Sequence, residues 1–235
     1  MKKVFFVFAA VALLSAGLWS CGKEDDNNDS ASSGGGGQAE VVWVDLGLPS
    51  GLLWADRNVG ASSPESYGNY YAWGETAPKS TYNGDTYAYG SGVYQFTKYC
   101  SNADFGLNGF TDNLTVLLPG DDAATANMGN GARTPTKEEW QELLDNTVSV
   151  WTSQNGVNGR LSIASNGNSI FLPAAGIYRW GDELFGAEGD GDYWSSSLYT
   201  DFPNDAWSFV FNSSGQYMYD GSRFDGLTVR AVRQN

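Results

Sequence analysis

Aromatic residues and glycine together constrain the fold of this 235-residue chain more than any other feature of its sequence. The chain contains 9 Trp, 13 Tyr, 12 Phe and 30 Gly, whereas only 17% of its residues are charged. Aromatic side chains favour strands and large buried contacts, and glycine favours turns and loops. Disordered acidic segments are poor in aromatic residues, and helical bundles are poor in glycine. The composition therefore predicts a globular domain with much β structure and long loops.

The chain contains no histidine, and this absence excludes several classes of active site. Ser-His-Asp and Cys-His catalysis, His-ligated zinc and ordinary haem ligation all need an imidazole. Its 13 Lys and Arg against 27 Asp and Glu give a formal net charge of -14. Proteins that bind nucleic acids need a basic face, so we expect no nucleic-acid partner.

Residues 1–20 have the pattern of a bacterial lipoprotein signal peptide. Two lysines precede an apolar run over 4–14, which is too short to span a membrane as a helix. The sequence LWSC over 18–21 resembles a lipobox. This pattern predicts that Cys21 is lipidated and anchors the protein in the outer membrane. An ordinary cleaved signal peptide with an incidental cysteine is the alternative.

Residues 21–40 are expected to be the lipidated cysteine, an acidic export signal and a flexible tether. Lys23, followed by acidic residues at 24–26, resembles the signal that sends lipoproteins of the Bacteroides group to the cell surface. A solvated spacer is compatible with that interpretation. The Asn/Ser/Gly-rich stretch 27–38 predicts a flexible linker with a mean span of roughly 20 Å. Ser30 lies in a short sequence that resembles an O-glycosylation acceptor of the same bacteria.

Residues 41–235 are expected to form one α+β domain. Thr136 and Glu139 form a capping box at the start of the best helix, and Trp140, Leu143 and Leu144 make its apolar stripe. A second helix is expected over 121–126, a helical turn over 64–67, and a surface loop over 79–92. The predicted strands are 41–44, 52–59, 160–165, 169–173, 193–196, 206–211, 216–219 and 228–232.

Seven sequence blocks occur in an order that resembles one known family. The blocks are VDLGLPSGLLWADRNVGA (44–61), SPESYGNYYAWGET (63–76), LPGDDAA (118–124), RTPTKEEWQELL (133–144), SIFLPAAG (169–176), YWSSS (193–197) and LTVRAV (227–232). They resemble the Fibrobacter succinogenes major paralogous domain, which is common in surface lipoproteins of gut bacteria. The resemblance implies a C-type lectin-like fold with mixed antiparallel sheets, one or two helices and long loops.

Most residues of these blocks have structural interpretations. The large rings are expected in the core, and the glycines in turns and at close backbone approaches. Arg133 and Arg230 are expected to pair with acidic residues inside the fold. The expected core rings are Trp54, Tyr71, Trp73, Trp140, Phe171 and Trp194, and the glycines are Gly47, Gly60, Gly68, Gly74 and Gly176.

Three features bear on catalysis or metal binding. Formylglycine-generating enzymes, which share the implied fold, use a cysteine pair, whereas residues 41–235 contain only Cys100. We expect Cys100 to be a buried apolar residue and not a reactive thiol. The serines of 195–197 have no neighbouring base and no G-x-S-x-G context, so we expect them to bond neighbouring strands or loops.

The third feature is an acidic stretch over 182–192, where a carboxylate pair or a calcium site is conceivable. Glu188, Asp190 and Asp192 alternate like the first ligands of an EF-hand loop. However, Tyr193 stands where that loop needs glycine, and no position-12 Glu follows. An acidic hairpin loop is the alternative. We expect no catalytic residue, no metal and no cofactor, and these three acids remain the weak calcium candidates.

The segment 198–225 carries the candidate ligand-binding residues. Its Tyr, Ser, Asn, Asp and Gly resemble the composition of antibody paratopes, in which rigid rings supply area and short polar side chains supply adaptable hydrogen bonds. The Pro203-Asn204-Asp205 sequence lacks the leading Glu or Gln of calcium-dependent lectins. Solvated loop residues without a ligand are the alternative. The candidates are Tyr199, Asp201, Asn204, Asp205, Asn212, Gln216, Tyr217, Tyr219, Asp220 and Arg223.

These observations favour a surface-anchored, non-catalytic recognition module that binds a glycan or protein ligand without a lectin-type calcium site. Its expected partners are that ligand at the cell surface and the membrane, through the lipid on Cys21. A structural or assembly subunit of a surface complex is the main alternative. An enzyme, or a variable receptor diversified by a retroelement over residues 198–224, are further alternatives.

Overall fold

Antiparallel sheets dominate the structure, as the strand patterns predict. The computed structural model describes residues 40–92 and 94–235, all of them within the compact unit Gln38–Asn235. Of these residues 39% are in strands and 11% in helices, which confirms a mixed α+β fold with few helices. The expected signal peptide, the Cys21 anchor, the export signal, the tether and Ser30 lie outside the described residues.

The order of strands and helices follows the predicted order. The strands are β1 (Trp43–Asp45), β2 (Leu53–Asn58), β3 (Tyr70–Tyr71), β4 (Thr147–Gln154), β5 (Val157–Ala164), β6 (Ser169–Pro173), β7 (Ile177–Arg179), β8 (Glu183–Phe185), β9 (Asp190–Leu198), β10 (Asp205–Asn212), β11 (Gln216–Ser222), β12 (Leu227–Thr228) and β13 (Arg230–Arg233). The helices are α1 (Ala123–Met128) and α2 (Lys137–Asn146), with short 3-10 segments η1 (Leu107–Gly109) and η2 (Pro119–Asp121).

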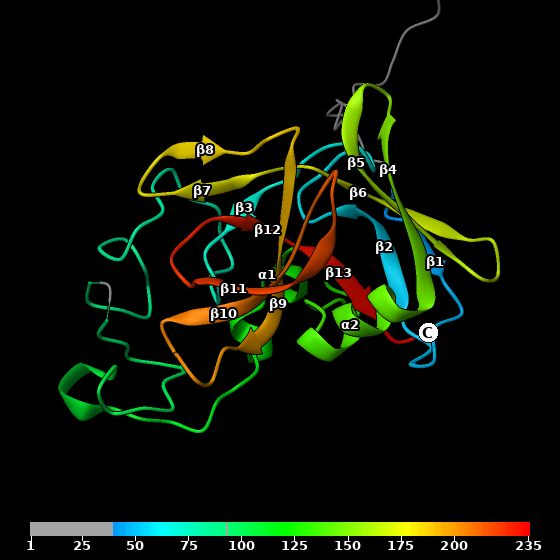
Figure 1. Cartoon of the computed structure of the whole chain (residues 1–235). Helices are drawn as coiled ribbons and strands as arrows, with labels where there is room; N and C mark the ends of the chain where they lie inside the picture. Colours follow the sequence, from blue (N-terminus) through cyan, green and yellow to red (C-terminus); the bar gives the residue numbers. More distant parts are fainter. Residues whose placement is uncertain (1–39, 93) are drawn as a thin grey trace, which may run out of the picture. The chain divides into compact units, whose positions relative to one another are not determined.

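The largest sheet has five strands in the order β11-β10-β9-β12-β3, and its β12–β9 pair is parallel. Strands β9, β10 and β11 lie side by side in Figure 1, where they are coloured from yellow-orange to red-orange. Two three-stranded sheets, β1-β2-β13 and β4-β5-β6, and the β7-β8 hairpin complete the sheets of the described chain. Strand β11 is therefore an edge strand of the largest sheet.

Helix α2 begins at the predicted capping box. The Thr136 side chain accepts a hydrogen bond from the Glu139 backbone N–H, and the Glu139 carboxylate accepts one from the Thr136 N–H at 2.8 Å. Arg133 pairs with Glu139, which confirms the internal ion pair expected for Arg133. Trp140 is buried and stacks on Phe209 of β10 with 4.7 Å between ring centroids. This packing places α2 against one face of the five-stranded sheet.

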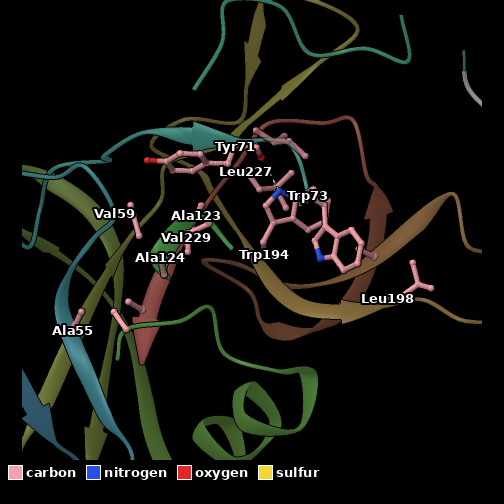
Figure 2. Packing of buried hydrophobic residues seen from close by; sticks show 14 of the residues in the cluster. Ala55, Val59, Tyr71, Trp73, Ala123, Ala124, Trp194, Leu198, Leu227 and Val229 are labelled. Carbon is pink, nitrogen blue, oxygen red and sulfur yellow. Dashed lines mark hydrogen bonds between the residues drawn. The ribbon is translucent and has the colours of Figure 1, made fainter. Parts of the chain in front are cut away.

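The predicted core rings are all buried. Figure 2 shows Trp73 and Trp194 side by side, with Tyr71 and Leu227 next to them. Their polar edges are satisfied, because Trp194 Nε1 donates to the Tyr71 carbonyl at 2.7 Å and Trp73 Nε1 donates to the Ser195 carbonyl at 2.8 Å. Rings of this size each bury on the order of 150–250 Å², so these contacts are a major source of stability.

The predicted turn glycines all have positive φ. Gly176 is the clearest case, because its φ is +68° and a Cβ there would lie 2.2 Å from the Phe185 carbonyl oxygen. Only glycine fits this close approach. Cys100 is buried, and desolvation raises the pKa of its thiol, as expected for an apolar core residue. In the described part of the chain, no helix has the length and apolar character needed to cross a membrane.

Three local predictions are wrong. Residues 64–67 form a turn and not a helical segment. The loop over 79–92 is not only a surface loop, because Tyr82 and Tyr87 are buried in a core cluster of their own. Arg230 is fully buried, but among the described residues its guanidinium pairs with no acidic side chain. Its guanidinium donates to neutral oxygens instead, namely Asn58 Oδ1 and the carbonyls of Ala55 and Phe171, and burial lowers its pKa to about 10.

Strand β9 carries a β-bulge where it pairs with β10. The partners step from Ala206 and Leu198 to Ser208 and Trp194, so the extra residues lie on β9, whereas β10 pairs with β11 without interruption and keeps Trp207 on the same face as Phe209. Trp207 is half-buried, and its ring packs against Tyr199 with 4.9 Å between centroids. A bulge inserts an extra residue into one strand and redirects the side chains beyond it.

Candidate functional site

The register of β9, β10 and β11 aligns three side chains across the sheet. Asp192 lies opposite Val210, and Val210 lies opposite Tyr217. Directly opposed residues of antiparallel strands point to the same face. Phe209, the neighbour of Val210, points to the other face and packs against Trp140 of α2. The row from Asp192 to Tyr217 therefore lies on the face that α2 leaves open.

A groove runs along this face, between the sheet and the β7-β8 hairpin. It consists of two neighbouring hollows of about 530 and 320 Å³, which have Arg179 and Tyr219 in common among their lining residues. We name it the β9–β11 groove. The side chains that determine its chemistry are Arg179, Asp192, Asp205, Tyr217, Tyr219 and Asp225.

Two tyrosines form an aromatic wall on the edge strand. Tyr217 and Tyr219 are 51% and 53% exposed, and their rings meet edge to face with 6.0 Å between centroids. Alternate residues of a strand point to the same side, and within residues 40–92 and 94–235 no further strand pairs with the outer edge of β11. Trp180, on the turn of the β7-β8 hairpin, lines the larger hollow and is 78% exposed. Exposed rings of this kind offer flat apolar area to a ligand.

Asp192 is buried at the base of the smaller hollow and has an unusual environment. The residue is 7% exposed, and within residues 40–92 and 94–235 its carboxylate accepts no hydrogen bond and joins no ion pair. Desolvation raises the pKa of Asp192 to about 6, against the attraction of Arg179 and with a further increase from Asp190. Buried carboxylates are normally paired or hydrogen-bonded. Asp192 therefore presents unused acceptor capacity to the groove.

Asp225 and Asp205 extend this acidity into the larger hollow. Arg179 Nε lies 3.3 Å from Asp225 Oδ2 without hydrogen-bond geometry, so the contact is an ion pair only. Desolvation is the main reason that the pKa of Asp225 is raised to about 7 and that of Asp205 to about 6. Repulsion between neighbouring carboxylates adds to both shifts.

Four of the ten sequence candidates line the β9–β11 groove: Asp205, Tyr217, Tyr219 and Asp220. Tyr199 and Asp201 lie elsewhere, in a hollow of about 390 Å³ beside Trp207. In that hollow the Lys137 ammonium sits 3.4 Å above the centre of the Trp207 ring. The structure therefore divides the candidates between two places on the surface.

Two candidates lie inside the fold. Arg223 is 0% exposed, and its guanidinium donates hydrogen bonds to the Tyr87 hydroxyl and to the carbonyls of Lys98, Tyr99 and Pro203. Asn204 is 8% exposed and donates to Asp205 Oδ1 at 2.9 Å. Neither side chain is available to a ligand in this structure.

The last two candidates have local roles. The Asn212 side chain accepts hydrogen bonds from the backbone N–H groups of Ser214 and Gly215, and so stabilises the turn between β10 and β11. Gln216 is half-buried and alternates with Tyr217, so it points to the other face of β11. Its Oε1 accepts no hydrogen bond from the described residues.

The calcium candidates do not form a ligand set. Asp190 and Asp192 line the groove, but Glu188 is exposed on the preceding turn and has a φ of +69°. In the part of the chain that the structure describes, no three Cys, Asp or Glu side chains converge as a metal ion would require. The serines of 195–197 behave as expected in part: Ser195 Oγ donates to the Trp207 carbonyl, and Ser197 Oγ accepts from the Lys137 N–H.

Sequence reasoning missed the residues that the β7-β8 hairpin brings to the groove. Arg179, Trp180 and Phe185 lie in a stretch for which no strand was predicted. Asp225 is not among the predicted site residues, and Asp192 is predicted only as a member of a carboxylate pair or as a weak calcium candidate. A signal for the hairpin exists: a Tyr-Arg-Trp-Gly sequence precedes an acidic pair and Leu184-Phe185.

Comparison of the chain with models of protein families, with curated proteins and with solved structures gives no match. The family resemblance therefore rests on the seven sequence blocks alone.

Proposed function

We propose that this protein is a non-catalytic recognition module that binds a glycan in the β9–β11 groove. The observation that carries the proposal is the pair of exposed rings, Tyr217 and Tyr219, beside buried carboxylates that have unused acceptor capacity. Sugar rings present apolar C–H faces and hydroxyl donors. Aromatic faces match the first property, and carboxylate oxygens match the second.

The form of the groove supports binding of an extended ligand. Its two hollows adjoin, and they lie open along an edge strand and not in an enclosed cavity. Small-molecule pockets are usually concave and enclose most of the ligand, whereas an open groove suits several units of a chain. We propose in addition that the fold is C-type lectin-like, which the seven sequence blocks and the mixed antiparallel sheets support.

The proposal includes a lipid anchor on Cys21 and a location on the surface of the outer membrane. Its support is the lipobox-like sequence over 18–21 and the acidic residues that follow Lys23. Expression with a radiolabelled fatty acid tests the anchor: the wild-type chain should incorporate label, and Cys21→Ala should not. Equal labelling of both would contradict the anchor without affecting the groove.

A glycan array tests recognition. Three forms of the full chain, all carrying Cys21→Ala, are applied to the array. The first has the wild-type groove, the second carries Tyr217→Ala with Tyr219→Ala, and the third is the control Tyr94→Ala. Tyr94 is 56% exposed and lies outside the groove, so it matches the two groove tyrosines in exposure. We expect a set of glycans that is retained by the control and lost by the double variant. Absence of any bound glycan, or binding that the double variant preserves, would refute glycan recognition in this groove.

Strand β4 favours a second candidate function, as an assembly subunit. It is the edge strand of the β4-β5-β6 sheet, and it exposes Val148 (68%) and Val150 (45%). Exposed apolar edge strands are common sites of pairing with another chain. Cross-linking in intact cells should then capture a stoichiometric partner that Val148→Lys with Val150→Lys no longer binds. A monomeric wild-type protein without any cross-linked partner would exclude this candidate.

A further inference from the structure

We propose that the β9–β11 groove selects glycans that carry a free, protonated amino group, and that Asp192 receives this group. The inference rests on the proposed glycan recognition and specifies its ligand class. Three features of the groove support it: the excess of acidic side chains, the buried carboxylate of Asp192 and the position of the tyrosine wall.

The groove has a large excess of acidic groups. Five aspartates line its two hollows, at positions 190, 192, 205, 220 and 225, whereas Arg179 is the only basic side chain among the lining residues. Arg179 neutralises one of these charges, through Asp225. Opposite charge attracts and like charge repels most strongly where water is partly excluded. An anionic sugar is therefore disfavoured here, and a cationic one is favoured over its neutral counterpart.

Asp192 is the acid best placed to receive the cation. It is more than nine-tenths buried, it faces the smaller hollow, and none of the described residues bonds its carboxylate. An ammonium group has three N–H donors and no acceptor, which complements a carboxylate with unused acceptors. A neutral hydroxyl would supply one donor and no charge. The buried position of Asp192 makes the difference between these ligands larger than at the surface.

The tyrosine wall supports the same ligand class. Tyr217 lies in register with Asp192 across Val210, and the Tyr219 ring packs edge to face against it. Aromatic faces attract cations as well as apolar C–H groups. A glycan unit with its ring on the tyrosines can therefore direct an amino group along the row toward Asp192. Acidic and aromatic groups in the groove thus favour the same chemistry.

Isothermal titration with two matched oligosaccharides tests the inference. The ligands are the glucosamine tetramer, which carries free amines, and the N-acetylglucosamine tetramer, in which each amine is acetylated. With the full chain carrying Cys21→Ala at low salt and pH 6.5, where the sugar amines are protonated and Asp192 (pKa about 6) is still mostly ionised, we expect the free-amine tetramer to bind at least about tenfold more tightly. Asp192→Asn should remove this preference. The control Asp182→Asn, which removes an exposed charge from the hairpin turn, should retain it.

Salt dependence is a second measurement that does not depend on a variant. Affinity for the free-amine tetramer should fall as the salt concentration rises, because screening weakens attraction between charges. The inference would be overturned if the free-amine tetramer did not bind, or if it bound no more tightly than the N-acetylglucosamine tetramer. If the array still shows binding of neutral or acidic glycans that depends on Tyr217 and Tyr219, the proposed glycan recognition is supported and only the proposed preference for amines is refuted. An array without any tyrosine-dependent binding removes the proposed function itself.

Discussion

Replacement of Asp192 by Asn should change stability in a strongly pH-dependent manner. In the native protein, desolvation raises the pKa of Asp192 to about 6, whereas an unfolded aspartate has a pKa of about 3.9. Between these values the native state binds more protons than the unfolded chain, so the free energy of unfolding falls as the pH rises. This contribution is fully present below about pH 4 and is lost above about pH 6. At pH 8 the ionised carboxylate is therefore a net destabilising group.

The magnitude follows from the difference between the two pKa values. A shift of about two units corresponds to about 3 kcal/mol, at 1.36 kcal/mol per unit. Because Asp192 is 7% exposed, solvent screening removes little of this. Asp192→Asn keeps the shape and removes the charge, so any new contact of the amide acts equally at all pH values. The change in unfolding free energy on substitution should therefore be about 3 kcal/mol more stabilising at pH 8 than at pH 4.

Urea unfolding of wild type and Asp192→Asn at pH 4 and pH 8 measures this difference. The control is Asp182→Asn, whose exposed carboxylate should change stability by less than about 0.5 kcal/mol at either pH. If the effect of Asp192→Asn is the same at both pH values, the carboxylate is not desolvated in the native state. That result would refute the reasoning about unused acceptor capacity in the groove.

Three further predictions follow from the same structure. Tyr219→Ala should weaken binding of any array-identified glycan by about tenfold or more while changing stability by less than about 1 kcal/mol, because the ring is 53% exposed; titration and thermal melting together separate these effects. Affinity for the glucosamine tetramer should pass through a maximum between pH 8 and pH 5, because the sugar amines lose their protons at the alkaline end, whereas Asp225 (pKa about 7), Asp192 and Asp205 (both about 6) become neutral at the acid end; an affinity that stays flat across the series would contradict this. Thr136→Ala should destabilise the protein by about 1 kcal/mol through loss of the α2 cap, measured by urea unfolding, and an unchanged midpoint would show that the cap is redundant.

Features that depend on neighbours in the sequence were predictable. The capping box of α2 spans four residues, and the predicted strands 160–165 and 169–173 are joined by a short turn, so both predictions are confirmed. The edge-strand tyrosines were found because Tyr217 and Tyr219 alternate within one polar segment. In each case the residues that decide the structure lie close together in the chain.

Features that depend on distant segments were not predictable. Arginine is usually a surface residue. Arg223 is buried because the loop over 79–99 packs around it and supplies hydrogen-bond acceptors for its guanidinium. Strand β4 is an exception, because it is absent from the predicted strands although the Asn155-Gly156 turn that joins it to β5 is a strong local hairpin signal. The groove itself exists only because the β7-β8 hairpin meets the sheet, and no local pattern specifies that meeting.

The buried guanidinium of Arg223 has a consequence for cooperativity. One side chain bonds Tyr87, the backbone at 98–99 and Pro203, and Pro203 lies more than a hundred residues along the chain from the other two. None of these acceptors is a carboxylate, so the charge is stabilised only while all of them stay in place. If any one of these segments opens, the Arg223 guanidinium loses some of its hydrogen-bond acceptors. Amide hydrogens in these three segments should therefore exchange together as one unit, with a common protection that the rest of the long loop region does not share.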